Sequence, residues 1–362
     1  MATSARLQSF IRRSEVRGIV ASLLCMCLAV ASIARPGSDV ASFRLELPAE
    51  LRFAQDIRWV TDSAVMISAG RAGVFELPLT GSPAPRRVLR GGDPKGFFFC
   101  SRLGVGSQYF VTAAPLFAVA FVRTADARID QLSFSATVDI DAKGDRVAIL
   151  GAQRDGRGTW SSDGAIAWTG SLADKGKNLR ILLRSQAGPG ARTMALCHFL
   201  EMGAIRFMPD GSLVVVPGVD PGVYVFDSQG RLRETWDTAP LGFSDRCSLS
   251  LREFQLLARS GVSRAQWING HEIIDDVIAL PEGPGLILRR WKSGHVTWRL
   301  IRLRPSAKAR SDDLPFQSTS PDTHLRADVR GHRLAVLFFE FEEIPGSKPA
   351  RPNEIIVQDL PR

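Results

Sequence analysis

Aspartates recur at or near the start of several short apolar runs, and their side chains are the groups in this sequence best suited to binding a metal ion. Carboxylate oxygens are the hard ligands that Ca²⁺ prefers, so aspartates that converged on one axis would create a calcium site. Aspartate also caps turns, which explains the same positions with fewer assumptions. No cofactor is therefore predicted, and calcium is kept as the alternative. The aspartates are Asp56, Asp139, Asp141, Asp276 and Asp328.

One stretch, Arg289 to Arg299, is both basic and rich in aromatic residues. Its residues Arg290, Trp291 and Trp298 could hold an anionic or sugar ligand through guanidinium contacts and ring stacking. The simpler interpretation is a hairpin far from any site, with tryptophans packed between sheets and arginines facing water. The three residues are the candidate ligand surface, and the simpler interpretation is favoured.

No catalytic residue is predicted. The run from His271 to Asp276 looks like a metal or acid–base cluster, but a zinc-protease motif requires a second histidine where Asp275 stands. The sequence has no Gly-x-Ser-x-Gly nucleophile elbow and no phosphate-binding glycine loop. A nucleophile, a base and an orienting group cannot be assembled from these residues.

The first 34 residues have the features of an export signal. Arg6, Arg12, Arg13 and Arg17 precede an uncharged run from Gly18 to Ala34, which ends in the small residues of a cleavage site. Cleavage after Ala34 is expected, and an uncleaved membrane anchor is the alternative. In either case the remaining domain, residues 35–362, is expected in the periplasm or at the cell surface.

Composition supports a large folded domain. Hydrophobic residues make up 45% of the 362 and charged residues 23%, which excludes a disordered chain. The formal charge of +9 is scattered along the chain, so nucleic acid is not expected as a partner. After cleavage Cys100, Cys197 and Cys247 remain, and their pairing is left open.

The body of the chain repeats one unit six times: a short strand, a tight turn and a strongly apolar strand, followed by an outer pair of strands. Units of roughly 40 to 70 residues with this content are typical of a β-propeller, in which sheets stack around a central axis. The inner hairpins are expected at Ile57–Ile67, Cys100–Val111, Val138–Leu150, Ile205–Val216, Val277–Leu288 and Ala327–Phe338.

Two further features complete the predicted architecture. Val40 to Leu47 and Glu354 to Leu360 are expected as strands of one blade, which would close the ring and remove an open sheet edge. A long spacing around residues 238–270 predicts an inserted loop that carries a helix at Ser250–Ala258. The fold class is thus all-β, a single propeller of six blades with four strands each.

The stretch Phe207 to Val215, with Val223 to Asp227 and Gly230, resembles a blade of the six-bladed propeller superfamily. The similarity is to the TolB-like, NHL-like and YncE-like groups of exported bacterial proteins, over about residues 40–361. It implies architecture and no activity, because propellers host many unrelated functions. Calcium-dependent lactonase propellers also use asparagine ligands, and no asparagine of this chain stands at a recurrent position.

The sequence therefore favours an exported, non-catalytic binding or scaffold protein. Its expected ligand is a protein, peptide or glycan of the cell envelope, held on one face of the propeller near the inserted loops. Two alternatives stay open: a calcium-dependent hydrolase or lactonase with an axial metal, and a structural part of an envelope complex. Membrane contact is expected only with an uncleaved anchor, and the oligomeric state is not determined by these patterns.

Overall fold

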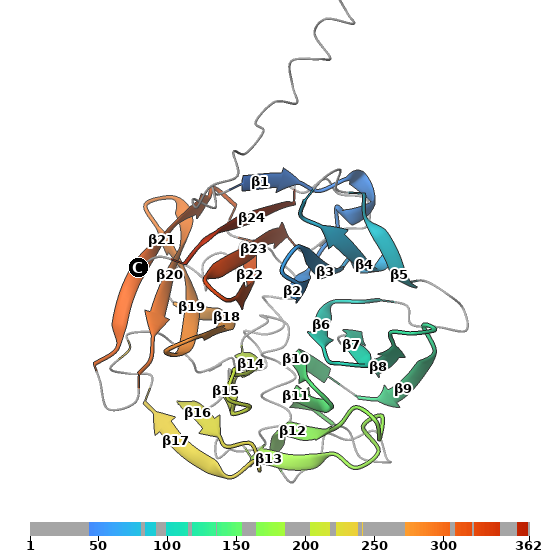
Figure 1. Ribbon diagram of the computed structural model, residues 1–362. Coiled ribbons are helices and arrows are strands. Elements are labelled where there is room, and N and C mark those ends of the chain that lie inside the picture. The colour runs from blue at the N-terminus through green and yellow to red at the C-terminus, as the bar shows by residue number, and fades with distance from the viewer. Residues whose placement is uncertain are drawn as a thin grey trace, which may run out of the picture. The chain divides into compact units, whose positions relative to one another are not determined.

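The described residues form a six-bladed β-propeller, which confirms the predicted fold class. Six antiparallel sheets of four strands surround one axis (Figure 1). All described residues belong to the unit Ser42–Arg362. The computed structural model describes residues 43–80, 84–91, 99–114, 118–134, 136–153, 164–184, 203–217, 222–237, 241, 272–304, 308–320, 322–340 and 353–360.

Each blade runs outward from an innermost strand along the chain, and the sixth blade borrows its outermost strand from the amino-terminal side. Blade 1 consists of β2 (Asp56–Thr61), β3 (Ala64–Ser68), β4 (Gly73–Pro78) and β5 (Arg86–Arg90). Blade 2 consists of β6 (Arg102–Val105), β7 (Tyr109–Ala114), β8 (Ala118–Arg123) and β9 (Ile129–Ser133). Blade 3 consists of β10 (Ala136–Lys143), β11 (Arg146–Ala152), β12 (Ala165–Ser171) and β13 (Arg180–Arg184). Blade 4 consists of β14 (Gly203–Phe207), β15 (Leu213–Pro217), β16 (Val223–Phe226) and β17 (Leu232–Trp236). Blade 5 consists of β18 (Ile273–Leu280), β19 (Gly283–Lys292), β20 (His295–Arg302) and β21 (Arg310–Ser318). Blade 6 consists of β22 (Thr323–Arg330), β23 (Arg333–Glu340), β24 (Glu354–Asp359) and β1 (Phe43–Glu46).

The sequence determines which strands lie inside. The two inner strands of a blade are covered on both faces by neighbouring blades, so they read as continuous apolar runs, as in β15 with its Leu-Val-Val-Val sequence. The outermost strands are more exposed to solvent and carry charged side chains, as in β17. Glycines at positive φ, including Gly144 and Gly331, provide the left-handed backbone that tight hairpin turns require. All six predicted inner hairpins are confirmed.

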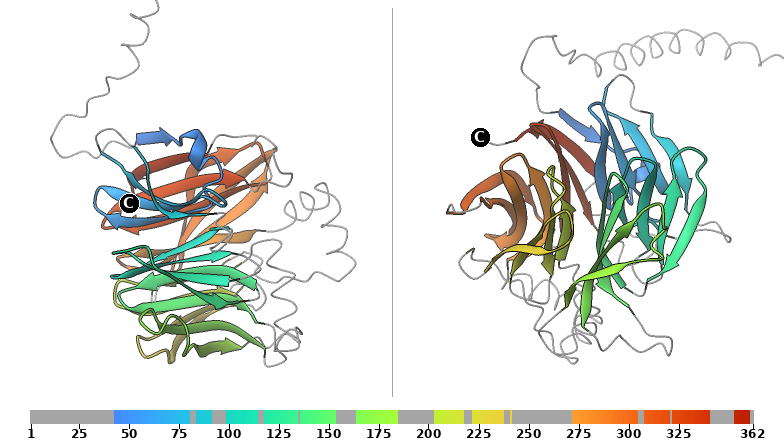
Figure 2. Two further views of the ribbon diagram at one scale, coloured as in Figure 1. Left: turned by 90° about the vertical axis from the view of Figure 1, so that its right-hand side faces the viewer. Right: turned by 60° about the horizontal axis from the view of Figure 1, so that its bottom comes forward.

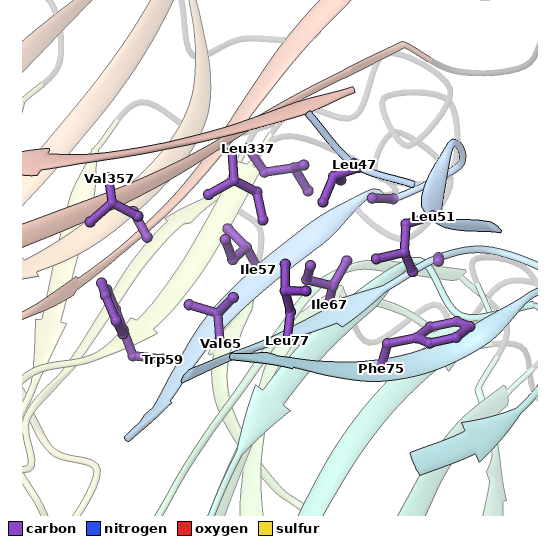
Figure 3. Close-up of a cluster of buried hydrophobic side chains, with 14 residues drawn as sticks. Leu47, Leu51, Ile57, Trp59, Val65, Ile67, Phe75, Leu77, Leu337 and Val357 are labelled. Atoms are coloured by element: carbon purple, nitrogen blue, oxygen red, sulfur yellow. The ribbon is translucent and has the colours of Figure 1, made fainter. Parts of the chain in front are cut away.

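Closure of the ring joins the first and last parts of the described chain. Strand β1 pairs with β24 in antiparallel register, from Phe43 opposite Val357 to Glu46 opposite Glu354. The predicted closure is therefore confirmed. A hydrophobic cluster then fills the space between blade 6 and blade 1, where Leu337 and Val357 face Ile57 and Val65 (Figure 3).

Viewed from the side, the sheets are strongly twisted and stack blade against blade around the ring (Figure 2). Apart from the single 3-10 turn η1 (Ala49–Leu51), the described residues form no helix. A helix long and apolar enough to cross a membrane is likewise not found among them.

Several predictions from the sequence concern residues outside the described ranges. These are the export signal at residues 1–34, the insertion at 238–270 with its helix, and the cysteines Cys197 and Cys247. Cys100 is described and is a free thiol. Burial raises the pKa of the Cys100 thiol to about 12, so it stays protonated and unreactive at neutral pH.

The closure cluster predicts the effect of truncating Leu337. This fully buried side chain packs across the junction of blades 6 and 1, so Leu337→Ala should lower the free energy of unfolding by about 2–5 kcal/mol. Leu232→Ala, at a side chain 56% exposed, is the control and should change it by less than about 0.5 kcal/mol. Urea unfolding measures both. Equal effects would contradict the assignment of Leu337 to the core.

Candidate axial binding site

The innermost strands create a hydrogen-bonding problem at the axis of the propeller. Each one, such as β2 or β14, is an edge strand, because only one side of its backbone pairs within the blade. The N–H and C=O groups on the other side point toward neighbouring innermost strands. Since they are buried there, they need partners other than water.

Aspartate carboxylates accept six of these N–H groups across the junctions between blades. At four of the six junctions a carboxylate on one innermost strand accepts a backbone N–H of the next one at 2.8–3.2 Å. The pairs are Asp56 with Leu103, Asp139 with Ile205, Asp141 with Phe207, Asp275 with Leu325, Asp276 with Ala327, and Asp328 with Trp59.

Buried arginines bridge the two remaining junctions by donating to carbonyl groups. The Nε of Arg102 on β6 donates to the carbonyl oxygen of Val138 on β10 at 2.9 Å. The Nε of Arg206 on β14 donates to the carbonyl oxygen of Val277 on β18 at 2.9 Å. Every junction in the ring is thus bridged by a charged side chain of an innermost strand.

The charges around the axis neutralise one another to different degrees. Asp276 accepts from the Nη2 of Arg206 at 2.7 Å and lies 3.7 Å from the Nη1 of Arg326. Burial alone would raise the pKa of Asp276, but Arg206, Arg326 and Arg58 outweigh it and hold the pKa below its usual range. In turn Asp276 and Asp141 raise the pKa of Arg206 against the effect of its burial. Burial dominates at Asp56, whose pKa is raised although Arg58 lies 2.6 Å away.

Asp141 is a buried carboxylate of the axis with a raised pKa, and it lines the pocket described below. Burial raises its pKa to about 6, and the opposing contributions of Arg206, Arg58 and the Phe207 N–H do not offset this. The distances explain the difference, because Arg206 lies 3.5 Å and Arg58 3.9 Å from the nearer Asp141 oxygen. Asp328 is a further negative charge that raises the same pKa.

The predicted metal ligands converge on the axis, but their surroundings do not fit a calcium ion. Among the described residues no group of three or more His, Cys, Asp or Glu side chains is placed to hold a metal. Asp56, Asp276 and Asp328 each accept at least two hydrogen bonds. Arg58 and Arg206 occupy the space between the carboxylates with positive charge, where a cation would be repelled.

A pocket of about 640 Å³ opens at one end of the axis, where the innermost strands end and turn into their hairpins. All six blades contribute to its wall. Its charged residues are four basic and two acidic side chains. They are Arg58, Lys143, Arg206, Arg330, Asp141 and Asp328. The remaining wall residues are apolar or glycine: Trp59, Val105, Ala142, Phe207, Pro209, Ala279, Pro281, Val329 and Gly331.

Hydrogen bonds between blades fix the rim of this pocket. Lys143 donates to the carbonyl of Met208 and, at 2.7 Å, to that of Pro209, so it joins blade 3 to the hairpin of blade 4. Arg330 pairs with Asp62, which joins blade 6 to the hairpin of blade 1. The pocket is therefore preformed rather than assembled from free side chains.

The candidate ligand surface at β19 and β20 is placed differently. Trp298 is fully buried, and its indole N–H donates to Asp275 at 2.7 Å, so its ring is not available for stacking on a ligand. Trp291 is partly buried and packs against the hydrophobic cluster that contains Trp298. Arg290 pairs with Asp313 at 2.8 Å and with Glu272 at 3.5 Å. Arg290 and Trp298 line a smaller hollow of about 500 Å³, which shares no lining residue with the axial pocket.

Sequence reasoning missed the arginines at the axis. Arg58, Arg102, Arg206 and Arg326 each stand within an innermost strand and are 1–3% exposed. The available signal was their position, because each is followed by an apolar residue in a short strand and three of them are also preceded by one, where a solvent-facing arginine is not expected.

Comparisons with known proteins identify no family and no activity for this chain. No protein-family model and no curated protein sequence matches the chain. Among solved structures, a streptogramin B lyase is 10% identical with a TM-score of 0.48, over 91% of this chain and 90% of that one. A gluconolactonase from Xanthomonas campestris is 13% identical with a TM-score of 0.48, over 88% and 90%. The WD40 propeller domain of Doa1 is 10% identical with a TM-score of 0.46, over 86% and 95%.

Removing one axial carboxylate should be costly. Asp276→Asn leaves Arg206 buried without its closest anionic partner, and we expect a loss of about 3–5 kcal/mol in the free energy of unfolding. Asp62→Asn breaks an ion pair whose carboxylate is 90% exposed and screened by water, so it should change the free energy of unfolding far less. Urea unfolding compares the two variants, and similar losses would contradict a structural role for the axial network.

The raised pKa of Asp141 predicts how stability depends on pH. The unfolded chain ionises first, so the Asp141 contribution to stability should fall as pH rises from about 4 to about 6 and stay constant above. The measured quantity is the free energy of unfolding of the wild type minus that of Asp141→Asn. This difference should decrease by about 2–3 kcal/mol between pH 4 and pH 6. Asp275, with its pKa lowered to about 2, changes its contribution only below pH 4 and does not overlap. A difference independent of pH would refute the assignment.

Proposed function

We propose that the protein is an exported, non-catalytic binding module whose ligand, a protein segment, peptide or glycan of the envelope, enters the axial pocket. The observation that carries this proposal is the pocket of about 640 Å³ built from the strand ends of all six blades. Its volume lies in the range of sites that hold small molecules or the end of a larger one.

The organisation of the polar groups favours recognition over chemistry. Asp328 is engaged by the Trp59 N–H at 2.8 Å and the Val329 N–H at 2.9 Å, and Lys143 by two carbonyl groups. Side chains held in this way can present charge to a ligand at fixed positions. A nucleophile with an adjacent base, which catalysis of group transfer would require, has no counterpart among the described wall residues.

A broad apolar docking face receives less support than the pocket. In the described part of the chain, Leu232 on β17 is the one large hydrophobic side chain that is exposed. Interfaces of envelope assemblies usually involve contiguous apolar patches of several hundred Å². The location outside the cytoplasm rests on the sequence of residues 1–34, and the proposal includes it on that basis.

Blocking the pocket should abolish ligand binding without unfolding the protein. Val329→Trp places a large ring in the pocket wall, and Leu232→Trp adds the same ring on an outer strand as the matched control. Both full-length variants and the wild type are applied to peptide and glycan arrays. We expect the wild type and Leu232→Trp to bind the same ligands. The affinity of Val329→Trp for them should be at least about tenfold lower, because the ring fills the site.

Unchanged thermal midpoints and circular dichroism spectra would show that Val329→Trp remains folded. Ligands bound equally well by the blocked variant, or no retained ligand on either array, would refute the proposed site.

A further inference from the structure

Among the described cations of the axial pocket, Arg58 is the one with buried nitrogen atoms that have no hydrogen-bond partner. Its Nη1 donates to Asp56 at 2.6 Å and to the carbonyl of Ile57 at 2.7 Å. Its Nε and Nη2 have no hydrogen-bond acceptor, although the side chain is only 3% exposed. Leaving buried N–H groups of a guanidinium unpaired is unfavourable, so the arrangement is that of a site to which an acceptor can be added.

The two unpaired groups lie on the same edge of the guanidinium. Nε–H and the nearer Nη2–H are parallel, and this edge matches the two oxygens of a carboxylate in a bidentate pair. The other arginine of the pocket, Arg206, is different, because its Nε, Nη1 and Nη2 contact Val277, Asp141 and Asp276. The two arginines therefore differ, because Arg206 completes the ring with all three of its nitrogen atoms whereas Arg58 has one buried edge without a hydrogen-bond acceptor.

The charge of the wall agrees with an anionic ligand group. Its four basic and two acidic side chains leave an excess of two positive charges. Lys143 and Arg330 stand at the rim, where they would attract an anion toward the axis. Trp59 and Phe207 supply apolar surface for the part of the ligand that bears the anion.

We propose that Arg58 binds a carboxylate of the ligand through its Nε–Nη2 edge inside the axial pocket. This inference rests on the proposed function and makes it more specific, since it names the chemical group recognised. The carboxylate could belong to a peptide terminus or to an acidic sugar, and both present the same pair of oxygens to the arginine.

A ligand carboxylate at Arg58 would lie close to Asp141, whose nearer oxygen is 3.9 Å from Nε. Two carboxylates sharing a site cannot both stay ionised without cost, so Asp141 should take up a proton when the ligand binds. The charged groups that face Asp141 are Arg58 from β2, Arg206 from β14, Asp328 from β22 and Lys143 on its own strand. With its pKa already at about 6, Asp141 makes that protonation easy near neutral pH.

The first test uses full-length protein and two pairs of probes, the tripeptide Gly-Gly-Ala against its carboxyl-terminal amide, and glucuronate against its methyl ester. Binding is measured by calorimetry at constant ionic strength. We expect at least one acid to bind and its neutral counterpart to bind at least about tenfold more weakly. Which acid binds distinguishes a peptide ligand from a sugar ligand. Equal binding of acid and neutral counterpart in both pairs, or binding of none of the four, would overturn the proposal.

The second test compares two lysine variants at equivalent buried positions. Arg58→Lys keeps the charge but loses the bidentate edge, and should weaken binding of the acid at least about tenfold. Arg102→Lys makes a similar change on β6 at a residue outside the pocket wall, and should leave binding within about twofold. Equal losses in both variants would overturn the proposal. Should Arg58→Lys fail to fold, the probe pairs and the pH dependence still decide it.

The third test is the pH dependence of binding. If Asp141 must be protonated, binding should be about twentyfold weaker at pH 7.5 than at pH 5.5, because the competent fraction falls with pH. Asp141→Asn should bind with little dependence on pH. A wild-type affinity independent of pH would overturn the proposal. If the array ligands that fail to bind Val329→Trp carry no carboxylate, the carboxylate inference is refuted and the proposed function stands. If no array ligand depends on the pocket, both are refuted.

Discussion

The backbone edge that faces the axis constrains the whole propeller. Six innermost strands bring unpaired N–H and C=O groups into a space with little water, and an unpaired amide there would destabilise the fold. Aspartates accept the N–H groups and arginines donate to the carbonyls, at 2.8–3.2 Å in every junction of the ring. The charged axis is therefore part of the fold, and the hydrophobic clusters between blades are arranged around it.

This constraint also limits what the axis can do. Carboxylates that already accept backbone and guanidinium hydrogen bonds have few lone pairs left for a metal ion. Guanidinium groups between them make the site electrostatically unfavourable for a cation. Arg58 differs from Arg206, the other arginine of the pocket, because one of its edges is not used in closing the ring. A ligand group that completes this edge adds hydrogen bonds without removing any that the propeller needs.

The architecture could be predicted from the sequence because its signals are local. Turn residues such as Asp210-Gly211 and the apolar run Leu213 to Val216 define the inner hairpins without knowledge of their neighbours. The closure by β1 and β24 followed from the need to remove a free sheet edge. These inferences require only the period of the strands and the chemistry of turns.

The site could be predicted only in part, because its signals are not local. The aspartates were identified by their recurrence, and the structure does bring Asp56, Asp139 and Asp276 to the axis. Their arginine partners were not identified, because an arginine in a basic chain is expected at the surface. Arg206 and its partner Asp276 are 70 residues apart, and nothing in the segment around Arg206 reveals that carboxylate. Trp298 shows the opposite case, in which a residue type common in binding sites is a core residue whose N–H holds Asp275.

The distances within the network determine which carboxylate can respond to a ligand. Asp276 and Asp141 both lie near two arginines, yet Asp276 accepts hydrogen bonds at 2.7–2.9 Å from three donors and its pKa is lowered. Asp141 accepts one hydrogen bond at 2.8 Å and has its arginines at 3.5 and 3.9 Å, and its pKa is raised. Close hydrogen bonds do not lower the pKa of a buried carboxylate by themselves, because Asp56 accepts three at 2.6–2.8 Å and its pKa is still raised. At Asp276 they act together with Arg206, Arg326 and Arg58. Asp141 has fewer of them and lies in the pocket wall beside Arg58, where a change of charge can be coupled to binding.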